Sequence, residues 1–169
     1  MKSEFDRVYE IMEESFPYDE MRTYEGQKAL LKNDNYKLIC KKDENENIIA
    51  FMTLWKTDSF YFIEHLATSK ESRGSGIGSK FLKQYIENAK KPIILEVEPP
   101  TTEIAKRRIG FYERLGFHLS DFCYEQPPLR EDSNTCPLQI MSYPKPLSEK
   151  DFLKYKNVLF KHIYKVDIK

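Results

Sequence analysis

Residues 66–85 read LATSKESRGSGIGSKFLKQY, and this stretch decides the fold. An apolar run ends near Thr68, a glycine-rich loop spans residues 73–78, and an amphipathic helix begins directly behind the loop. The loop glycines can take backbone angles closed to other residues and let a ligand approach the main chain. Unpaired N–H groups at the start of the helix attract negative charge. The stretch therefore predicts a site for a phosphate-bearing cofactor.

The composition limits the partners of the chain. With 169 residues it has the length of one domain with a proper core, which we take as residues 1–169. Basic residues number 27 and acidic residues also number 27, so the net charge attracts neither nucleic acid nor a membrane surface. The sequence therefore favours a small molecule as the partner.

The cysteines and the first residues indicate the compartment. Cys40, Cys123 and Cys136 are an odd number without metal-ligand spacing, so we expect free thiols in a reducing compartment and no metal site. The opening sequence MKSEFDRVYEIMEE carries acids where a signal peptide needs an apolar centre, and no apolar run approaches the length of a membrane span. These features predict a cytoplasmic protein.

Three strands are predicted ahead of the glycine loop. Two helices come first, the second of them short and capped by Thr23. The alternating residues 36–40, the apolar run 48–55 and the run 60–68 then form an antiparallel meander. The helix behind the loop must end before Pro92 and leads to a short apolar strand. Strand, helix and strand together are the pattern of a parallel crossover.

The remaining elements complete an α+β domain with a mixed sheet. One of two adjacent threonines can cap a helix that stops at Gly116, where a left-handed residue belongs. Two strands follow, at 117–125 and 138–143, and a C-terminal helix is predicted at about 148–164. Most neighbouring strands in this arrangement are antiparallel.

The glycine loop alone leaves two interpretations open, a phosphate site and a purely structural turn. A Walker loop is excluded because Gly78 is followed by Ser79 and then Lys80, the reverse of the required order. A dinucleotide loop is excluded because it needs a parallel strand near the start of the fold, whereas this loop follows an antiparallel meander.

A second motif helps to decide between a phosphate site and a structural turn. The loop sequence RGSGIG at 73–78 follows a strand ending in LAT, and residues 111–117 read FYERLGF. Together, in this order and at this distance, the two motifs resemble those of the GCN5-related N-acetyltransferase (GNAT) family. The order of elements from residue 36 to residue 143 resembles that family too, which covers about two thirds of the chain.

The resemblance implies a sheet with a central splay and helices on its flanks. In the family, the strand before the loop and the next parallel strand diverge, and the pantetheine arm of acetyl-CoA lies in the gap. Here those strands are residues 60–68 and 93–97. The implied cofactor is acetyl-CoA, held by the strand end and the loop. The implied contacts are Leu66, Ala67, Thr68, Arg73, Gly74, Ser75, Gly76, Ile77, Gly78 and Ser79.

Two side chains are candidates for the chemistry. Tyr112 matches the family tyrosine that commonly gives a proton to the departing thiolate, and a core aromatic residue is the alternative. Glu64 interrupts an apolar strand, where alternation puts it on the same face as Phe62 and Leu66. His65 would then face the other way as a structural histidine. A buried charge is costly unless it is paired. Glu64 is therefore a general base, acting directly or through water, or part of a salt bridge, or a residue exposed at the edge of the splay.

The acceptor site is predicted from position. Residues 16–22, FPYDEMR, lie where the family lines its acceptor pocket, and Tyr124 with residues 126–128 could face them. Glu96 and Glu98 could attract a cationic amine or be solvated charges at a strand end. Aromatic residues beside acids would suit an amine with an apolar body.

Three positions depart from the family pattern. Ala105 stands where the family often has an asparagine that contacts the cofactor, and the usual first strand is not evident because the chain begins with a helix. Gly110 lies inside a helix, where glycine costs roughly 1 kcal/mol relative to alanine. A close approach by the cofactor or the sheet would explain that glycine.

The resemblance therefore implies an acyltransferase that moves an acetyl group from acetyl-CoA directly to a primary amine of a small molecule or peptide. The alternative is a non-catalytic acyl-CoA-binding or regulatory module, in which the loop persists without proton chemistry. A structural domain with a chance glycine turn is a third hypothesis. A homodimer is one possible assembly.

Overall fold

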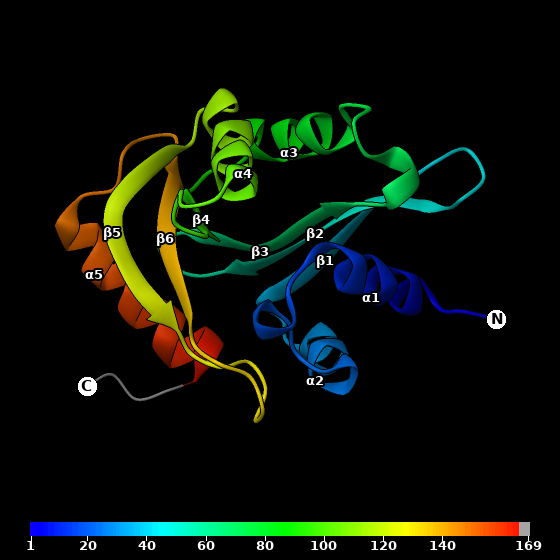
Figure 1. Cartoon of the computed structure of the whole chain (residues 1–169), viewed down its shortest axis with the longest axis horizontal. Helices are drawn as coiled ribbons and strands as arrows, with labels where there is room; N and C mark the ends of the chain where they lie inside the picture. The colour runs from blue at the N-terminus through cyan, green and yellow to red at the C-terminus, as the bar shows by residue number, and fades with distance from the viewer. Residues whose placement is uncertain (166–169) are drawn as a thin grey trace.

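The computed structural model describes residues 1–165 and is built on one six-stranded sheet (Figure 1). The strands are β1 (Tyr36–Lys42), β2 (Ile48–Lys56), β3 (Tyr61–Thr68), β4 (Ile93–Val97), β5 (His118–Gln126) and β6 (Cys136–Tyr143). They lie in the order β1-β2-β3-β4-β6-β5. Neighbours are antiparallel except β3 and β4, which are parallel. The predicted α+β fold with a mixed, mostly antiparallel sheet is confirmed.

Helices cover both faces of the sheet (Figure 1). One face carries α3 (Ile77–Glu87) and α4 (Glu103–Arg114), and the other carries α1 (Glu4–Ser15), α2 (Tyr24–Ala29) and α5 (Glu149–Val158). Short 3-10 turns are η1 (Tyr18–Glu20), η2 (Leu30–Lys32) and η3 (Lys70–Ser72), and α5 continues into a π-helical segment, η4 (Leu159–Tyr164). The predicted C-terminal helix thus ends in a wider turn.

Local sequence signals set the helix starts. The hydroxyl of Thr23 accepts a hydrogen bond from the Gly26 amide at 3.1 Å, as predicted, and Thr102 accepts one from Ala105 at the same distance. These caps satisfy amides that have no partner within the helix. At the other end of α4, Gly116 has φ +98°, the left-handed conformation predicted for it.

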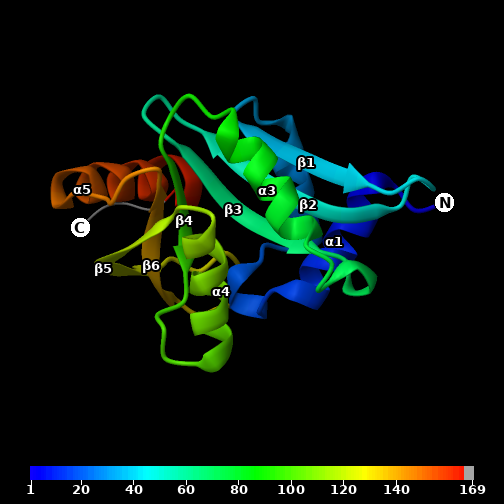
Figure 2. The same ribbon diagram turned by 90° about the horizontal axis from the view of Figure 1, so that it is seen from above.

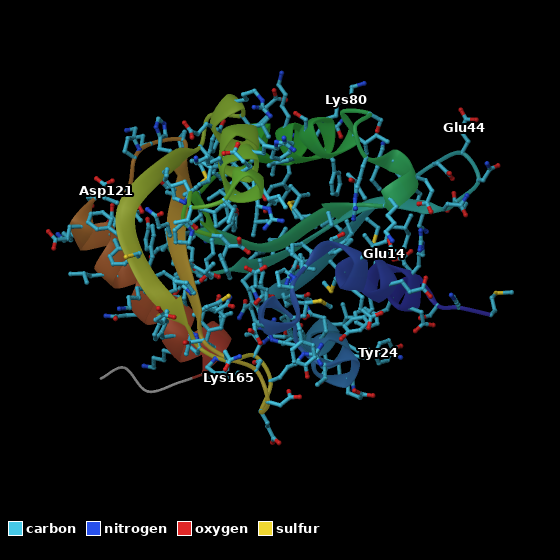
Figure 3. All side chains as sticks on the ribbon, in the orientation of Figure 1. Glu14, Tyr24, Glu44, Lys80, Asp121 and Lys165 are labelled. Atoms are coloured by element: carbon cyan, nitrogen blue, oxygen red, sulfur yellow. The ribbon has the colours of Figure 1, made fainter. Side chains whose placement is uncertain are left out.

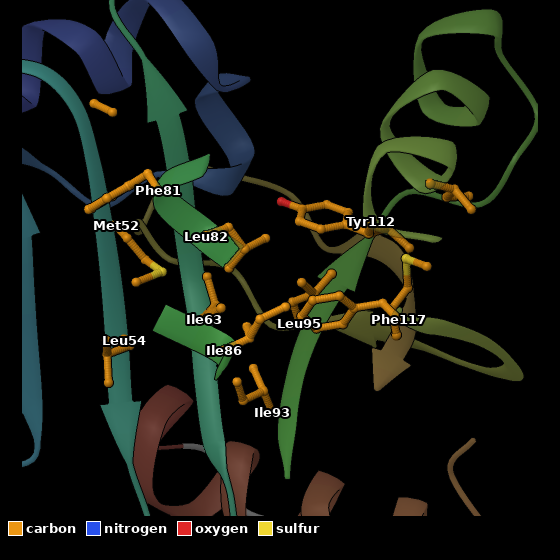
Figure 4. Packing of buried hydrophobic residues seen from close by; sticks show 14 residues of the cluster. Met52, Leu54, Ile63, Phe81, Leu82, Ile86, Ile93, Leu95, Tyr112 and Phe117 are labelled. Atoms are coloured by element: carbon orange, nitrogen blue, oxygen red, sulfur yellow. The ribbon is translucent and has the colours of Figure 1, made fainter. Parts of the chain in front are cut away.

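Each face of the sheet has its own core. Beneath α3 and α4, Leu82 and Ile86 pack with Ile63 and Leu95 of the central strands (Figure 4). On the opposite face, one cluster lies under α1 and a second lies under α5. Burial of these side chains on both faces of β3 and β4 explains why their sequences are almost wholly apolar.

The two parallel strands diverge after a short pairing. Only Tyr61–Ile63 of β3 pairs with Ile93–Leu95 of β4. Beyond those residues the strands separate, as the view from above shows (Figure 2). The predicted central splay is therefore present. In the described part of the chain, no strand precedes β1, in keeping with the helical start of the sequence.

A β-bulge lies where the splay begins. In the pairing of β2 with β3, Leu54 is opposite Ile63 and Thr53 is opposite His65, which leaves Glu64 as an extra residue. Bulges bend a strand and redirect a side chain, and they are common beside active sites. Here the bulge coincides with the end of the pairing between β3 and β4.

The bulge overturns one prediction. Glu64 was expected on the same face as both Phe62 and Leu66, but these two side chains pack in clusters on opposite faces of the sheet. The extra residue shifts the alternation by one, so Ile63 and Leu66 share the face under α3. A strict period of two cannot hold across an inserted residue.

Candidate active site

A cavity of about 660 Å³ lies between the glycine loop, the end of β3, the end of α1 and the helix α4. We call it the loop cavity. Nine of the ten predicted cofactor contacts line it: Leu66, Ala67, Thr68, Arg73, Gly74, Gly76, Ile77, Gly78 and Ser79. Ser75 does not line it and instead donates a hydrogen bond to the Ser72 carbonyl. The structure thus brings the predicted strand end and loop to one site.

The loop presents backbone amides to this cavity. Gly74 and Gly76 have φ values of +78° and +79°, which L side chains rarely adopt. Gly76 is also the N-cap of α3, and no side chain caps that helix. The first amides of α3 are therefore available to an anion, with the helix dipole behind them. Gly78 serves a different purpose, because a Cβ there would lie 3.2 Å from Thr68 Cγ2.

Arginines add positive charge to the loop cavity. Arg73 Nη2 donates to Ser15 Oγ at 3.1 Å and to the Glu14 carbonyl at 3.4 Å, so its side chain is turned toward the end of α1, where Figure 3 labels Glu14. The charge comes instead from α4, whose Arg107, Arg108 and Arg114 line the cavity. These three arginines were not predicted as part of the site. The basic run on the helix that also carries the tyrosine motif could have indicated them.

Tyr112 stands at the inner end of the loop cavity. Its side chain comes from α4, is 9% exposed and packs with its ring centroid 5.7 Å from that of Phe117. The hydroxyl points away from Phe117 toward β3 and α3 (Figure 4). Burial raises the pKa of Tyr112 to about 12, although the charge of Arg108 opposes this rise. At neutral pH the residue is thus a protonated phenol.

A second cavity, of about 60 Å³, also has Tyr112 in its lining. We call it the acidic cavity, because Glu20, Glu64, Glu96 and Glu98 all line it. It shares Phe16, Leu66, Arg108 and Tyr112 with the loop cavity. The two cavities therefore adjoin at Leu66, one of the predicted cofactor contacts, and at Tyr112, the predicted proton donor.

Glu64 forms a buried ion pair. Its Oε2 accepts a hydrogen bond from Arg22 Nη1 at 2.8 Å, and the two side chains are 2% and 11% exposed. Burial alone would raise the pKa of Glu64, but the charge and hydrogen bond of Arg22 lower it below its ordinary value. Its second oxygen, Oε1, is buried without a hydrogen-bond partner among the residues described.

His65 is a satisfied structural residue, as predicted. Its Nδ1 lies 3.3 Å from Thr53 Oγ1 and its Nε2 lies 3.1 Å from the Glu20 carbonyl oxygen. Burial lowers the pKa of His65. The imidazole therefore stays neutral at physiological pH and ties β3 to the η1 turn.

Glu96 lies at the splayed end of β4, within a set of hydrogen-bond donors. The hydroxyls of Tyr124 and Tyr164 both donate to its carboxylate, and Gln126 Nε2 donates at 3.4 Å. Burial raises the pKa of Glu96 to about 7, against the effect of the two phenols. Tyr164 was not predicted as a partner of Glu96, because 68 positions of the sequence separate the two residues.

The predicted acceptor segments meet at the acidic cavity. Phe16 and Glu20 come from the 16–22 segment, and Gln126 comes from the far end of β5. Burial raises the pKa of Glu20 to about 7, and the nearby charge of Glu98 adds to the rise. Pro127 and Pro128 are not among the lining residues. Glu20 and Glu96, two carboxyls with raised pKa values, thus line the same cavity.

Comparisons with known proteins agree with this geometry. The model of the Acetyltransferase (GNAT) family matches residues 5–117. YjbC of Bacillus subtilis (strain 168), described as an acetyltransferase, is 33% identical over 166 residues, which covers 93% of this chain and 82% of that protein. A solved structure from Bacteroides thetaiotaomicron, described as an acetyltransferase from the GNAT family, is 37% identical to this chain and has a TM-score of 0.86. The match covers 94% of this chain and 90% of that one.

More distant structures share the fold. An aminoglycoside 6'-N-acetyltransferase complexed with coenzyme A has a TM-score of 0.58 at 12% identity, covering 86% of this chain and 93% of that one. A phosphinothricin acetyltransferase from Sinorhizobium meliloti in complex with AcCoA has a TM-score of 0.59 at 15% identity, covering 86% and 85%.

The fold and the family match define an acetyltransferase, from a family whose members use acetyl-CoA as the acetyl donor. The chain belongs to the GNAT family of acetyltransferases. Within residues 1–165, no helix is both long and apolar enough to cross a bilayer.

Proposed function

We propose that this single domain transfers an acetyl group directly from acetyl-CoA to a primary amine that arrives as a cation in the acidic cavity. The observation that carries the proposal is the junction of the two cavities at Tyr112. The glycine loop lines one of these cavities and four carboxyls line the other. A cytoplasmic location and a homodimeric assembly stay predictions from the sequence.

The residues of the loop cavity fit acetyl-CoA. Open amides at the start of α3 and three arginines of α4 suit the phosphates. Beyond Ile63, the edge of β3 that faces β4 has no paired strand in the described structure, so a narrow chain can lie in the splay. Ala105, in place of the family asparagine, lines neither cavity. When bound, acetyl-CoA supplies an activated acetyl group.

Three groups of the protein perform the chemistry in this proposal. Backbone amides of residues 66–68 polarise the carbonyl that is attacked. Tyr112, kept protonated by burial, gives a proton to the departing sulfur. Glu64 contacts the acceptor nitrogen through Oε1, and the hypothesis that it also accepts the proton is tested below against a second carboxyl.

Two unpaired oxygens support an acceptor with N–H groups. Within the described structure, Glu64 Oε1 and Gln126 Oε1 are buried without hydrogen-bond donors, and both residues line the acidic cavity. A buried acceptor left without a partner costs about 1–3 kcal/mol. An ammonium group carries several N–H donors and a positive charge, so it satisfies both oxygens and the acidic surroundings. We propose a small molecule or peptide that presents such a group.

Two measurements test the proposal. Acetyl-CoA should raise the melting temperature, and free thiol should appear faster in the presence of primary amines than without enzyme. Stabilisation without turnover on a broad amine panel would favour the non-catalytic acyl-CoA-binding or regulatory module instead. Absence of any stabilisation by acetyl-CoA would contradict both.

A further inference from the structure

Glu96 has no part in the mechanism above, yet it accepts hydrogen bonds from three side chains in the acidic cavity. Its Oε2 accepts from the Tyr124 hydroxyl, and its Oε1 accepts from the Tyr164 hydroxyl and from Gln126 Nε2. Tyr164 belongs to the π-helical end of the chain, and short π-helical segments are frequent at functional sites. Two other elements, β5 and η4, thus converge on this carboxylate at the point where β4 parts from β3.

The two central carboxyls have different electrostatic surroundings. Glu64 faces a guanidinium at 2.8 Å, which favours its charged form. Glu96 accepts hydrogen bonds from neutral groups, and the negative charge of Glu64 raises its pKa further. The remaining titratable and charged groups that line the same cavity are Glu20, His65, Glu98, Arg108 and Tyr112. A carboxyl in such a setting gives up its charge much more readily than an ion-paired one.

We infer that Glu96 is the group that accepts a proton from the acceptor ammonium, while Glu64, ion-paired with Arg22, orients the nitrogen. This assignment rests on the proposed transfer reaction. Its geometric basis is that both carboxyls line one small cavity next to Tyr112 and Leu66. Each carboxylate oxygen of Glu96 has two lone pairs, so a further donor can bind beside the phenols.

The protons balance in this scheme. The ammonium loses one proton to Glu96, and the lone pair released on nitrogen forms the new C–N bond to the acetyl carbon. The C–S bond breaks with its electron pair on sulfur, which takes the proton of Tyr112. The nitrogen then loses its second proton, which restores the phenol of Tyr112. Glu96 returns its proton to solvent after the product leaves, so one proton is released overall.

The raised pKa of Glu96, about 7, supports this role. A general base works best when its pKa is near the operating pH. Glu64 has a lowered pKa and so is a weaker proton acceptor. Tyr164 is a positioning residue. Its hydrogen bond stabilises the charged carboxylate of Glu96 and so limits the rise of the Glu96 pKa.

The first experiment compares two nucleophiles at pH 7. Butylamine is protonated there and needs a proton acceptor, whereas hydroxylamine is largely neutral and does not. Glu96→Gln should lower thiol release with butylamine by about 100-fold and leave the rate with hydroxylamine within about threefold of the wild-type rate. Glu125→Gln, an exposed change of the same kind on β5, is the control. An equal loss with both nucleophiles, or no loss with butylamine, would overturn the assignment.

The second experiment does not depend on turnover. Carbon-13 NMR of glutamate-labelled protein should show a carboxyl that titrates near pH 7 and is lost in Glu96→Gln. Tyr164→Phe should move this titration to higher pH, since it removes a donor to the carboxylate. Tyr155→Phe, on the same helix but packed against Phe60, should not. If Glu96 titrates below pH 5, the inference fails even where acetyl transfer is observed. If neither nucleophile is acetylated while Glu96 titrates as expected, the proposed reaction with simple amines fails instead.

Discussion

Arg22 Nη1 and Glu64 Oε2 lie 2.8 Å apart, and this ion pair joins the segment after α1 to the bulge of β3. The contact spans 42 positions of the sequence. Because Glu64 is the inserted residue of the bulge, its side chain is directed away from Leu66 and toward the helices of the opposite face. Glu64, held in this position by the ion pair, lines the acidic cavity.

Breaking this pair should be costly. Arg22→Met removes the partner of a buried carboxylate, and we expect the free energy of unfolding to fall by about 3–5 kcal/mol. The double variant Arg22→Met/Glu64→Gln removes both charges and should recover part of that loss. Urea unfolding of the wild type and the variants measures these values. A loss below about 1 kcal/mol in the single variant would show that solvent screens the pair.

Tyr112→Phe should separate catalysis from cofactor binding. The variant keeps the ring that packs on Phe117 but lacks the proton for the departing sulfur. We expect kcat to fall by about 100-fold, with the melting shift produced by acetyl-CoA nearly unchanged. Tyr85→Phe, whose side chain lines neither cavity, is the matched control. An unchanged kcat would leave Tyr112 as a core residue only.

Gly76→Ala should weaken cofactor binding through the backbone. The position has φ +79°, and no atom lies within 4 Å of an added Cβ, so conformational strain rather than a clash opposes the side chain. Such strain costs about 1–3 kcal/mol. The loop amides should turn away from the cavity, and the melting shift produced by acetyl-CoA should shrink. A shift equal to that of the wild type would contradict the predicted anchor.

Gly110→Ala should stabilise the protein. The sheet does not approach this glycine, because the nearest neighbour of an added Cβ is Arg114 Nη1 at 3.4 Å, which belongs to a flexible side chain. The predicted close approach is therefore wrong as far as the sheet is concerned. Alanine in the middle of α4 should raise the free energy of unfolding by about 1 kcal/mol. A decrease, measured by thermal unfolding, would show that the arginine cannot move aside.

The acidic cavity should make stability fall as pH rises. Glu96 has a pKa of about 7 when folded, against 4.5 as its ordinary value. Between these values the folded chain binds more protons than the unfolded one, so the free energy of unfolding decreases with increasing pH. Glu20 contributes in the same direction. Glu96→Gln should make the decline between pH 5 and pH 8 shallower, whereas Glu125→Gln should keep the wild-type slope.

Much of the fold was predictable because its signals are local. The alternation of residues 36–40, the apolar run that follows and the glycine loop each specify their own element. The parallel crossover then follows from the order of the elements. The tyrosine motif at 111–117 gave the family because it lies at a suitable distance from the loop.

The acidic cavity was harder to predict because its contacts are not local. The bulge at Glu64 inserts a single residue and has no sequence signature of its own, so alternation assigned the wrong face to Leu66. Tyr164 reaches Glu96 only because α5 packs across the sheet and ends in a π-helical segment. The family resemblance put residues 16–22 near Gln126, and Phe16 and Glu20 line one cavity with it. The resemblance did not predict the hydrogen-bond partners of these residues.

The splay gives this protein two sheet edges that face inward. Past Ile63 and Leu95, the sides of β3 and β4 that face each other have no ladder partner in the described structure. Edges of this kind would invite another chain if they lay on the outside, but here α4 and the glycine loop border the gap. Amides on these edges should exchange with deuterium faster than those between β2 and β3. Acetyl-CoA should slow that exchange and so act as the missing strand.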